Sequence, residues 1–196
     1  MPRSSELKFI PLEIPEVVLV KPAVFGDHRG FFLETYNIEK YRAGGIADHF
    51  IQDNLSHSIR DTIRGLHIQT GKPQAKLVRV VAGEIFDVAV DVRLGSPTYG
   101  AWVGALLSSE NHHQLYLPRG FAHGFAVRSD TAVVEYKVSA PYDPTGDISI
   151  SWNDPDLNVD WGCEEPIISA KDAAAVSLAA SQIDLQRLAQ SLGRSG

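Results

Sequence analysis

The sequence predicts a single, mainly β domain built as an antiparallel sandwich or barrel. Short runs rich in β-branched and aromatic residues recur at intervals of about ten residues, with Gly, Pro, Asn and Asp turns between them. The one long stretch with helical spacing lies at the C-terminal end. A chain of 196 residues can form one substantial core without disulfides or structural metal, so we expect one domain over residues 1–196.

Composition excludes several classes of function. The net charge of −6 argues against nucleic-acid binding through broad phosphate contacts. Cys163 is the single cysteine, so neither an internal disulfide nor a cysteine metal cluster is expected. The polar start and the lack of a membrane-length apolar run predict a cytoplasmic protein with no membrane association.

The N-terminal third reads as extended chain with one short helix. Prolines interrupt the apolar residues between 9 and 24, which favours edge strands or an arm over helix. Residues 26–30 form a turn, and residues 31–36 form a strand with Phe32 and Glu34 on one face. Residues 37–44 predict a helix that Asn37 caps and Gly44 ends.

The predicted strand over residues 50–59 carries polar side chains at every second position, Gln52, Asn54, Ser56 and Ser58. That face either meets solvent or lines a polar cavity. Residues 63–67 form a short strand, and the apolar runs 77–82 and 84–92 are predicted to pair as a hairpin at Gly83. Further strands are expected at 102–108, 114–117, 121–126 and 132–138.

The C-terminal helix is expected from residue 170 or 171 to about residue 192. Ser169 precedes it and Asp172 follows three positions later, which is a variant of the capping box. On local pattern alone Asp172 is therefore an acid at the start of a helix.

The spacing Pro118-x-Gly120-x-x-His123 fits the second half of the cupin barrel signature. The first half does not fit, because His67-Ile68-Gln69 offers one histidine and no glutamate follows closely. We therefore expect no bound metal, and an interior histidine that serves acid–base chemistry or binding.

Several blocks together resemble the dTDP-4-dehydrorhamnose 3,5-epimerase family. They occur in the family's order and cover nearly the whole chain. The blocks are Asp27-His28-Arg29-Gly30-Phe31-Phe32, Gln52-Asp53-Asn54-Leu55-Ser56, Arg64-Gly65-Leu66-His67, Lys76-Leu77-Val78-Arg79-Val80, Pro118-Arg119-Gly120-Phe121-Ala122-His123-Gly124-Phe125, Tyr136-Lys137, Trp152-Asn153-Asp154-Pro155 and Ser169-Ala170-Lys171-Asp172.

The resemblance implies a cupin-type antiparallel β-barrel, or jelly roll, with short helices and a C-terminal helix. It implies a cofactor-independent isomerase acting on dTDP-4-dehydro-6-deoxy-D-glucose. The C4 ketone of that sugar acidifies the hydrogens at C3 and C5. Epimerisation then needs a base, a group that stabilises the enolate, and an acid on the opposite face.

The resemblance assigns the catalytic roles to four residues. His67 is implied as the base and Asp172 as the carboxylate that orients it. Lys76 is implied beside the C4 oxygen, although it also fits a solubilising lysine on an edge strand. Tyr136 is implied as the acid, although strand parity equally suits core packing.

The resemblance also assigns substrate contacts. It implies that Arg64 and Lys171 bind the pyrophosphate, because arginine binds two oxygens at once. His123 and Tyr142 would line the sugar and phosphate region, while Gln52 and Asn54 would bind the nucleotide. An N-terminal arm, residues 1–30, would be exchanged within a homodimer, so that the residues acting across the interface are Arg29, Phe32 and Glu34.

Two points stay open at this stage. Strict alternation points Arg64 and His67 to opposite faces, unless Gly65 introduces a bulge or one side chain reaches in from a strand end. Ile68 stands where the family often has an aromatic residue. Three alternative functions also remain: an epimerase acting at one carbon, a sugar-nucleotide-binding barrel without catalysis and, last, a metal-dependent oxygenase.

Overall fold

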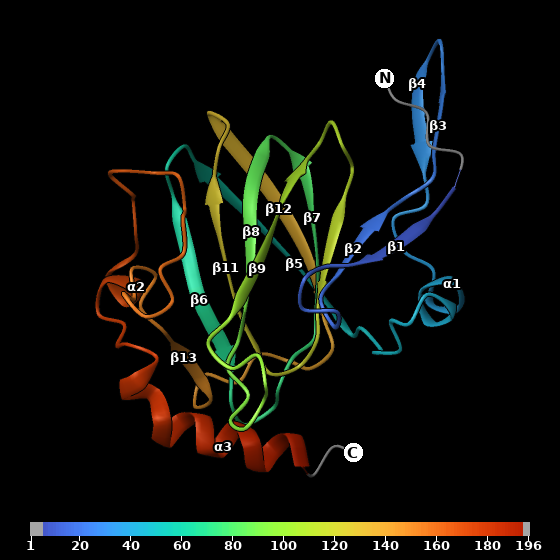
Figure 1. The fold of residues 1–196 in the computed structure, drawn as a ribbon. Coiled ribbons are helices and arrows are strands. Elements are labelled where there is room, and N and C mark those ends of the chain that lie inside the picture. Colours follow the sequence, from blue (N-terminus) through green and yellow to red (C-terminus); the bar gives the residue numbers. More distant parts are fainter. Residues whose placement is uncertain (1–5, 194–196) are drawn as a thin grey trace.

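The computed structural model describes residues 6–193 and contains two facing antiparallel sheets (Figure 1). The first five residues of the expected arm and the last three of the chain lie outside the described residues. The first sheet has the strand order β1 (Lys8–Pro11), β2 (Val18–Lys21), β10 (Gln114–Leu117), β7 (Lys76–Ala82), β12 (Thr131–Val138) and β5 (Gln52–Ile59). The second has the order β13 (Asp147–Ser149), β6 (Ile63–Gln69), β11 (Phe121–Val127), β8 (Glu84–Asp91) and β9 (Trp102–Ser108). This two-sheet β architecture confirms the predicted fold class.

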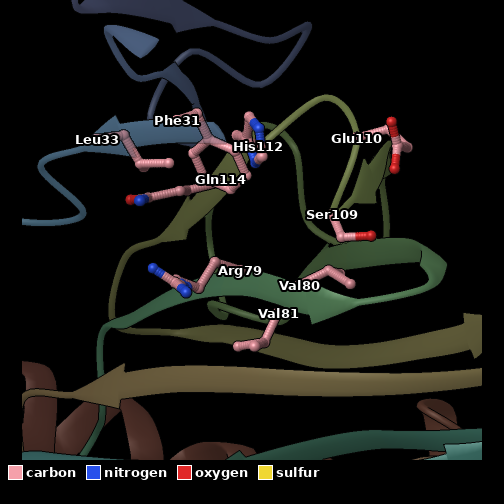
Figure 2. A pocket seen from close by; sticks show the side chains of 9 residues that line it. All are labelled: Phe31, Leu33, Arg79, Val80, Val81, Ser109, Glu110, His112 and Gln114. Atoms are coloured by element: carbon pink, nitrogen blue, oxygen red, sulfur yellow. The ribbon is translucent and has the colours of Figure 1, made fainter. Parts of the chain in front are cut away.

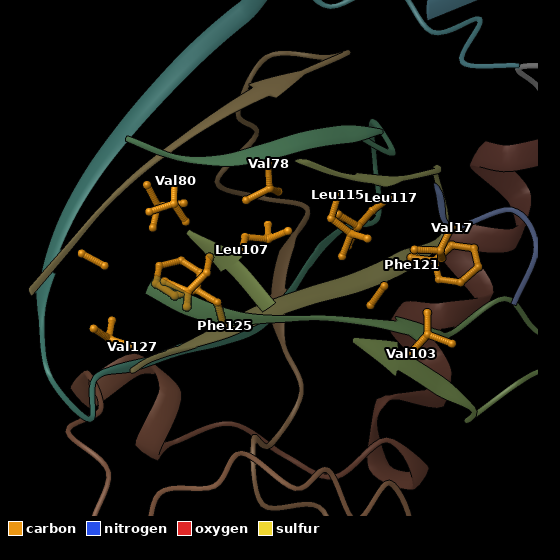
Figure 3. Packing of buried hydrophobic residues seen from close by; sticks show 14 of the residues in the cluster. Val17, Val78, Val80, Val103, Leu107, Leu115, Leu117, Phe121, Phe125 and Val127 are labelled. Carbon is orange, nitrogen blue, oxygen red and sulfur yellow. The ribbon is translucent and has the colours of Figure 1, made fainter. Parts of the chain in front are cut away.

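The central core lies between the two sheets (Figure 3). Side chains alternate across each strand, so every second residue points into this space. The first sheet contributes Val78 and Leu115, and the second contributes Phe121 and Phe125. Burial of these side chains from water is the main force that holds the sheets face to face.

Two further apolar clusters cover the outer faces of the barrel. The C-terminal helix α3 (Gln182–Gly193) buries Leu185 and Leu188 in one cluster with Val88 and Val90 of β8. The short helix α1 (Ile38–Ala43) buries Tyr41 in a cluster at the first sheet. Asn37 caps α1 by accepting hydrogen bonds from two backbone N–H groups, and Gly44 ends it, as predicted.

The predicted hairpin at Gly83 is wrong. β7 pairs with β10 and β12, whereas β8 pairs with β11 and β9, so the chain passes from one sheet to the other at Gly83. Gly83 has φ +82°, and a Cβ atom there would lie 2.1 Å from the Thr131 carbonyl oxygen. Glycine is therefore required at this corner for the turn and for the close approach of the backbone.

The predicted C-terminal helix is interrupted. It forms α2 (Ala170–Ala173), a 3₁₀ turn (Ala179–Ser181) and α3. Between them the backbone N–H of Ser151 donates to the Val176 carbonyl, and the N–H of Leu178 donates to the Asp154 carboxylate. These tertiary hydrogen bonds replace the helical ones, which is why helical spacing alone gave the wrong boundary.

The strands β3 (Val24–Asp27) and β4 (Gly30–Leu33) form a separate hairpin that projects from the barrel (Figure 1). This hairpin contains the predicted turn at residues 26–30. Among residues 6–193, none of the helices is both long enough and apolar enough to cross a membrane.

Candidate active site

A bulge in β6 places Arg64 and His67 on the same face of the second sheet. On β11, His123 is the partner of His67 and Phe125 the partner of Arg64, so two residues of β6 oppose one of β11. Gly65 adopts φ +130°, and a Cβ atom there would lie 2.5 Å from Gly124 Cα. The bulge resolves the parity conflict, because it turns both side chains toward the barrel interior.

A cavity of about 390 Å³ opens inside the barrel between the two sheets. Its wall is mostly polar, with the residues Gln52, Asn54, His67, Ile68, Gln69, Gln74, Lys76, Tyr136, Tyr142 and Asp147. We call it the inner cavity. Of the alternating polar residues of β5, Gln52 and Asn54 line this cavity, while Leu55 and Ile59 on the opposite face of that strand are exposed.

A second cavity, of about 560 Å³, adjoins the first and is called the outer cavity. Arg64 lines it together with Lys171 and Asp172 at the start of α2. His67 lines both cavities, so its imidazole stands at their junction.

The His67 imidazole is held by Asp172. Nε2 of His67 lies 2.6 Å from Oδ1 of Asp172, whose side chain is only 4% exposed while that of His67 is 31% exposed. Burial opposes ionisation of Asp172, yet hydrogen bonds from His67, from the Ser169 hydroxyl and from the Gly65 backbone N–H keep its pKa below the ordinary value. The backbone N–H of Asp172 donates to Ser169 Oγ, so Asp172 is both the predicted helix-start acid and the partner of His67.

A second histidine–carboxylate pair lies beside the first. Nε2 of His123 lies 2.7 Å from Oδ1 of Asp87, and both side chains are buried, at 7% and 0% exposed. Burial lowers the pKa of His123 against the opposing charge of Asp87, which favours the neutral imidazole. His123 is thus packed behind the cavity wall rather than open to it.

Lys76 and Tyr136 face the inner cavity from neighbouring strands, β7 and β12. Burial lowers the pKa of Lys76 to about 8, while the charges of Asp147 and Asp87 act in the opposite direction. Burial raises the pKa of Tyr136, so its hydroxyl keeps its proton at neutral pH. β7 is a central strand, which excludes the edge-strand interpretation of Lys76.

The predicted phosphate ligands surround the outer part of the site. The Arg64 guanidinium donates to Ser58 Oγ at 2.9 Å and to the His57 carbonyl. The Lys171 ammonium donates to Asp147 Oδ2, which also accepts from the Tyr142 hydroxyl. The Arg64 guanidinium and the Lys171 ammonium both line the outer cavity, and two positive charges there suit an anionic substrate.

The remaining predicted residues lie elsewhere in the single chain. Arg29, Phe32 and Glu34 belong to the β3–β4 hairpin or follow it, on the other side of the barrel from β6 and α2 (Figure 1). A separate cavity of about 240 Å³ forms where Phe31 and Leu33 meet the outer face of β7 (Figure 2). One chain therefore does not bring these three residues to His67, and their role stays a prediction.

Asp87 and Asp147 were missed from the sequence. Asp87 interrupts the apolar residues of β8, and an acid in the middle of a buried strand is the one signal that could have found it. Asp147 lies in a three-residue strand without a pattern. Within residues 6–193 no group of three His, Cys, Asp or Glu side chains is placed to hold a metal ion.

Comparison with known proteins identifies the family of this chain. The profile of the dTDP-4-dehydrorhamnose 3,5-epimerase family matches residues 11–180. An enzyme of that name from Pseudomonas aeruginosa is 50% identical over 85% of this chain and 93% of its own. A dTDP-4-dehydrorhamnose 3-epimerase from Streptomyces niveus is 39% identical over 88% of this chain and 84% of its own.

A solved structure extends the likeness to the fold. The dTDP-6-deoxy-D-glucose-3,5-epimerase from Legionella pneumophila, in complex with dTDP-4-keto-L-rhamnose, superposes with a TM-score of 0.89 at 47% identity. The match covers 92% of this chain and 97% of that one. The family profile and the sequence identity to these enzymes show that the chain belongs to the dTDP-4-dehydrorhamnose 3,5-epimerase family.

Proposed function

We propose that this protein converts dTDP-4-dehydro-6-deoxy-D-glucose to dTDP-4-dehydro-L-rhamnose by inverting C3 and C5 through an enolate. One observation carries the proposal: the His67–Asp172 pair stands at the junction of two cavities. The inner cavity offers a cation and a phenol beside that base. The outer cavity offers cations for a diphosphate.

His67 is proposed to remove the proton from C3 and from C5. Because Nε2 donates its hydrogen to the Asp172 carboxylate, Nδ1 is the ring nitrogen left to accept a proton. The imidazolium that forms is stabilised by the carboxylate held against it. The ring is open to the cavity, with 31% of the side chain exposed, and it can therefore act as the base.

Lys76 and Tyr136 are proposed to complete the reaction. As the proton leaves carbon, negative charge moves to the C4 oxygen, where the Lys76 ammonium would stabilise it. Tyr136 keeps its proton at neutral pH and would deliver it to the opposite face of the carbon.

The nucleotide is proposed to lie across the outer cavity, with its diphosphate on Arg64 and Lys171. Tyr142 would contact the sugar and phosphate region, and Gln52 and Asn54 would hydrogen-bond the nucleotide. His123 would line the sugar site from behind the cavity wall.

We propose that the working form is a homodimer. Leu55, Ile59 and Val81 are exposed on the outer face of the first sheet, and Phe25 and Phe32 are exposed on the hairpin. A soluble protein gains by covering such side chains. In a dimer that exchanges the arm, Arg29, Phe32 and Glu34 would reach the cavity of the partner.

Sedimentation analysis tests this interface. Leu55→Arg should yield a monomer, and a variant that remains dimeric would contradict the proposed interface.

Isotope exchange tests the proposed reaction. The 4-keto sugar nucleotide is incubated with the enzyme in deuterated water, and C3 and C5 are followed by NMR. Label at both carbons is expected. Label at one carbon would instead make the chain a single-carbon epimerase, the activity in the name of the Streptomyces niveus relative. Tight binding without label would indicate a non-catalytic barrel, and metal-dependent activity would revive the oxygenase alternative.

A further inference from the structure

Asp147 stands between the two parts of the site. It lies at the start of β13, where its backbone partner is Gln69 of β6, and its side chain is 11% exposed. It lines the inner cavity, whereas its partner Lys171 lines the outer one. The Asp147–Lys171 ion pair therefore connects the two cavities beside His67.

One carboxylate oxygen of Asp147 holds two side chains. Oδ2 accepts from the Lys171 ammonium and, at 3.1 Å, from the Tyr142 hydroxyl. Both donors are half-exposed or more, and long side chains of that kind otherwise lose much rotamer freedom when they grip a ligand. Asp147 therefore arranges them before the substrate arrives.

The arrangement has a cost for binding. A diphosphate that contacts Lys171 must compete with the carboxylate already bound to it, and the carboxylate repels the phosphates at short range. A residue whose task was only to increase nucleotide affinity would not be acidic at this point. The charge is better explained by placement of the sugar ring, which the two anchored groups would fix relative to His67.

From these contacts we propose that Asp147 is a positioning residue, which anchors Lys171 and Tyr142 to place the sugar over His67 at the expense of nucleotide affinity. The inference rests on the proposed function. It assigns Asp147 an effect on turnover opposite in direction to its effect on dTDP binding.

The test compares Asp147→Asn with Asp143→Asn. Both variants remove one negative charge from the same short segment, residues 143–147, and keep a side-chain oxygen as acceptor. Asp143 instead accepts hydrogen bonds from the N–H and hydroxyl of Thr145, and so serves as the matched control. kcat is measured with the 4-keto sugar nucleotide, and the dissociation constant of dTDP is measured by calorimetry.

Asp147→Asn should lower kcat by about tenfold to a hundredfold, because a small misplacement of a reacting carbon is costly. Its dissociation constant for dTDP should fall by about two- to fivefold, since a repulsive charge is gone. Asp147→Glu, which restores the charge, should recover part of kcat. Asp143→Asn should match the unmodified protein in both measurements.

A kcat that stays within twofold in Asp147→Asn would overturn the inference, and so would a parallel loss of kcat and dTDP affinity. If Asp147→Asn is poorly folded, Tyr142→Phe supplies a second route, since it removes one donor from an exposed position. The kcat loss caused by Tyr142→Phe should be smaller in an Asp147→Glu background, where the longer side chain already anchors Tyr142 less well. Full additivity of the two substitutions would contradict the inference. Absent exchange in the unmodified protein would refute the proposed function. Normal exchange in the unmodified protein together with an unchanged kcat in Asp147→Asn would refute this inference alone.

Discussion

The barrel holds two histidine–carboxylate pairs that are nearly equal in chemistry and unequal in access. Nε2 lies 2.6 Å from a carboxylate oxygen in His67–Asp172 and 2.7 Å in His123–Asp87. The two histidines are direct partners across β6 and β11. Only His67 lines a cavity, whereas His123 is buried.

The difference shows that a hydrogen-bonded pair becomes a candidate base through exposure rather than through the pairing itself. A carboxylate orients either imidazole, but burial removes His123 from direct contact with a substrate. The bulge at Gly65 and the loop before α2 give His67 its opening. We therefore assign proton abstraction to His67 and a supporting role to His123.

The largest expected effect separates the two histidines. His67→Asn should lower kcat by about a thousandfold, because it removes the base. His123→Asn should lower kcat by about tenfold or less. Steady-state turnover of the 4-keto sugar nucleotide measures both, with dTDP binding as the control for folding. Equal losses in the two variants would remove the distinction between the pairs.

The second largest expected difference is between the two carboxylate partners, Asp172 and Asp87. Asp172→Asn should lower kcat by about a hundredfold, since a neutral amide stabilises the imidazolium poorly and permits the wrong tautomer. Asp87→Asn should instead lower the free energy of unfolding by about 1–3 kcal/mol, because it weakens a buried hydrogen bond. Turnover and urea denaturation check the two effects. The comparison fails if Asp87→Asn reduces kcat as far as Asp172→Asn does.

Lys76 should give the site a pH dependence. Burial lowers the pKa of Lys76 from 10.5 to about 8, so the ammonium is present below about pH 8 and is lost as the pH rises. kcat should therefore fall by up to about tenfold per pH unit above that value. Lys76→Arg keeps its charge and should lack this fall in a pH–rate profile. If Lys76→Arg shows the same fall in kcat at high pH as the unmodified protein, the fall belongs to another titrating group.

The smallest effect concerns the bulge that admits His67. Gly65→Ala should lower the free energy of unfolding by more than about 1 kcal/mol, because the methyl group meets Gly124 and φ is positive. Gly45 also has a positive φ, yet a Cβ atom there meets nothing within 4 Å. Gly45→Ala is therefore the control, and thermal denaturation of both variants separates contact from backbone conformation. Equal destabilisation would show that the close approach to Gly124 costs little.

Much of the fold could be predicted because side-chain alternation and turn residues act locally. Asn37 and Gly44 bounded their helix correctly, and the polar face of β5 proved to line a cavity. The hairpin predicted at Gly83 was wrong, because a glycine between two apolar runs suits a hairpin and a corner between two sheets equally well. The C-terminal helix was wrong in its first half, because hydrogen bonds to distant groups decide where it breaks.

The site was less accessible to pattern reasoning. His67 and Asp172 are 105 residues apart, so resemblance to a family suggested their partnership while spacing could not. Asp87 and Asp147 belong to no recognisable motif, and only the assembled barrel shows which cations and imidazoles they face. The proposed roles of Arg29, Phe32 and Glu34 would require a second chain, which no local pattern describes.

Acylation of histidines with diethyl pyrocarbonate tests the central claim most directly. The folded protein is treated for increasing times, its seven histidines are mapped by mass spectrometry, and isotope exchange at C3 and C5 is measured in parallel. We predict that exchange is lost in proportion to the modified fraction of His67, and that dTDP slows both the modification and the loss. We also predict that His123 stays unmodified. Exchange that survives complete modification of His67 would contradict the assignment of the base.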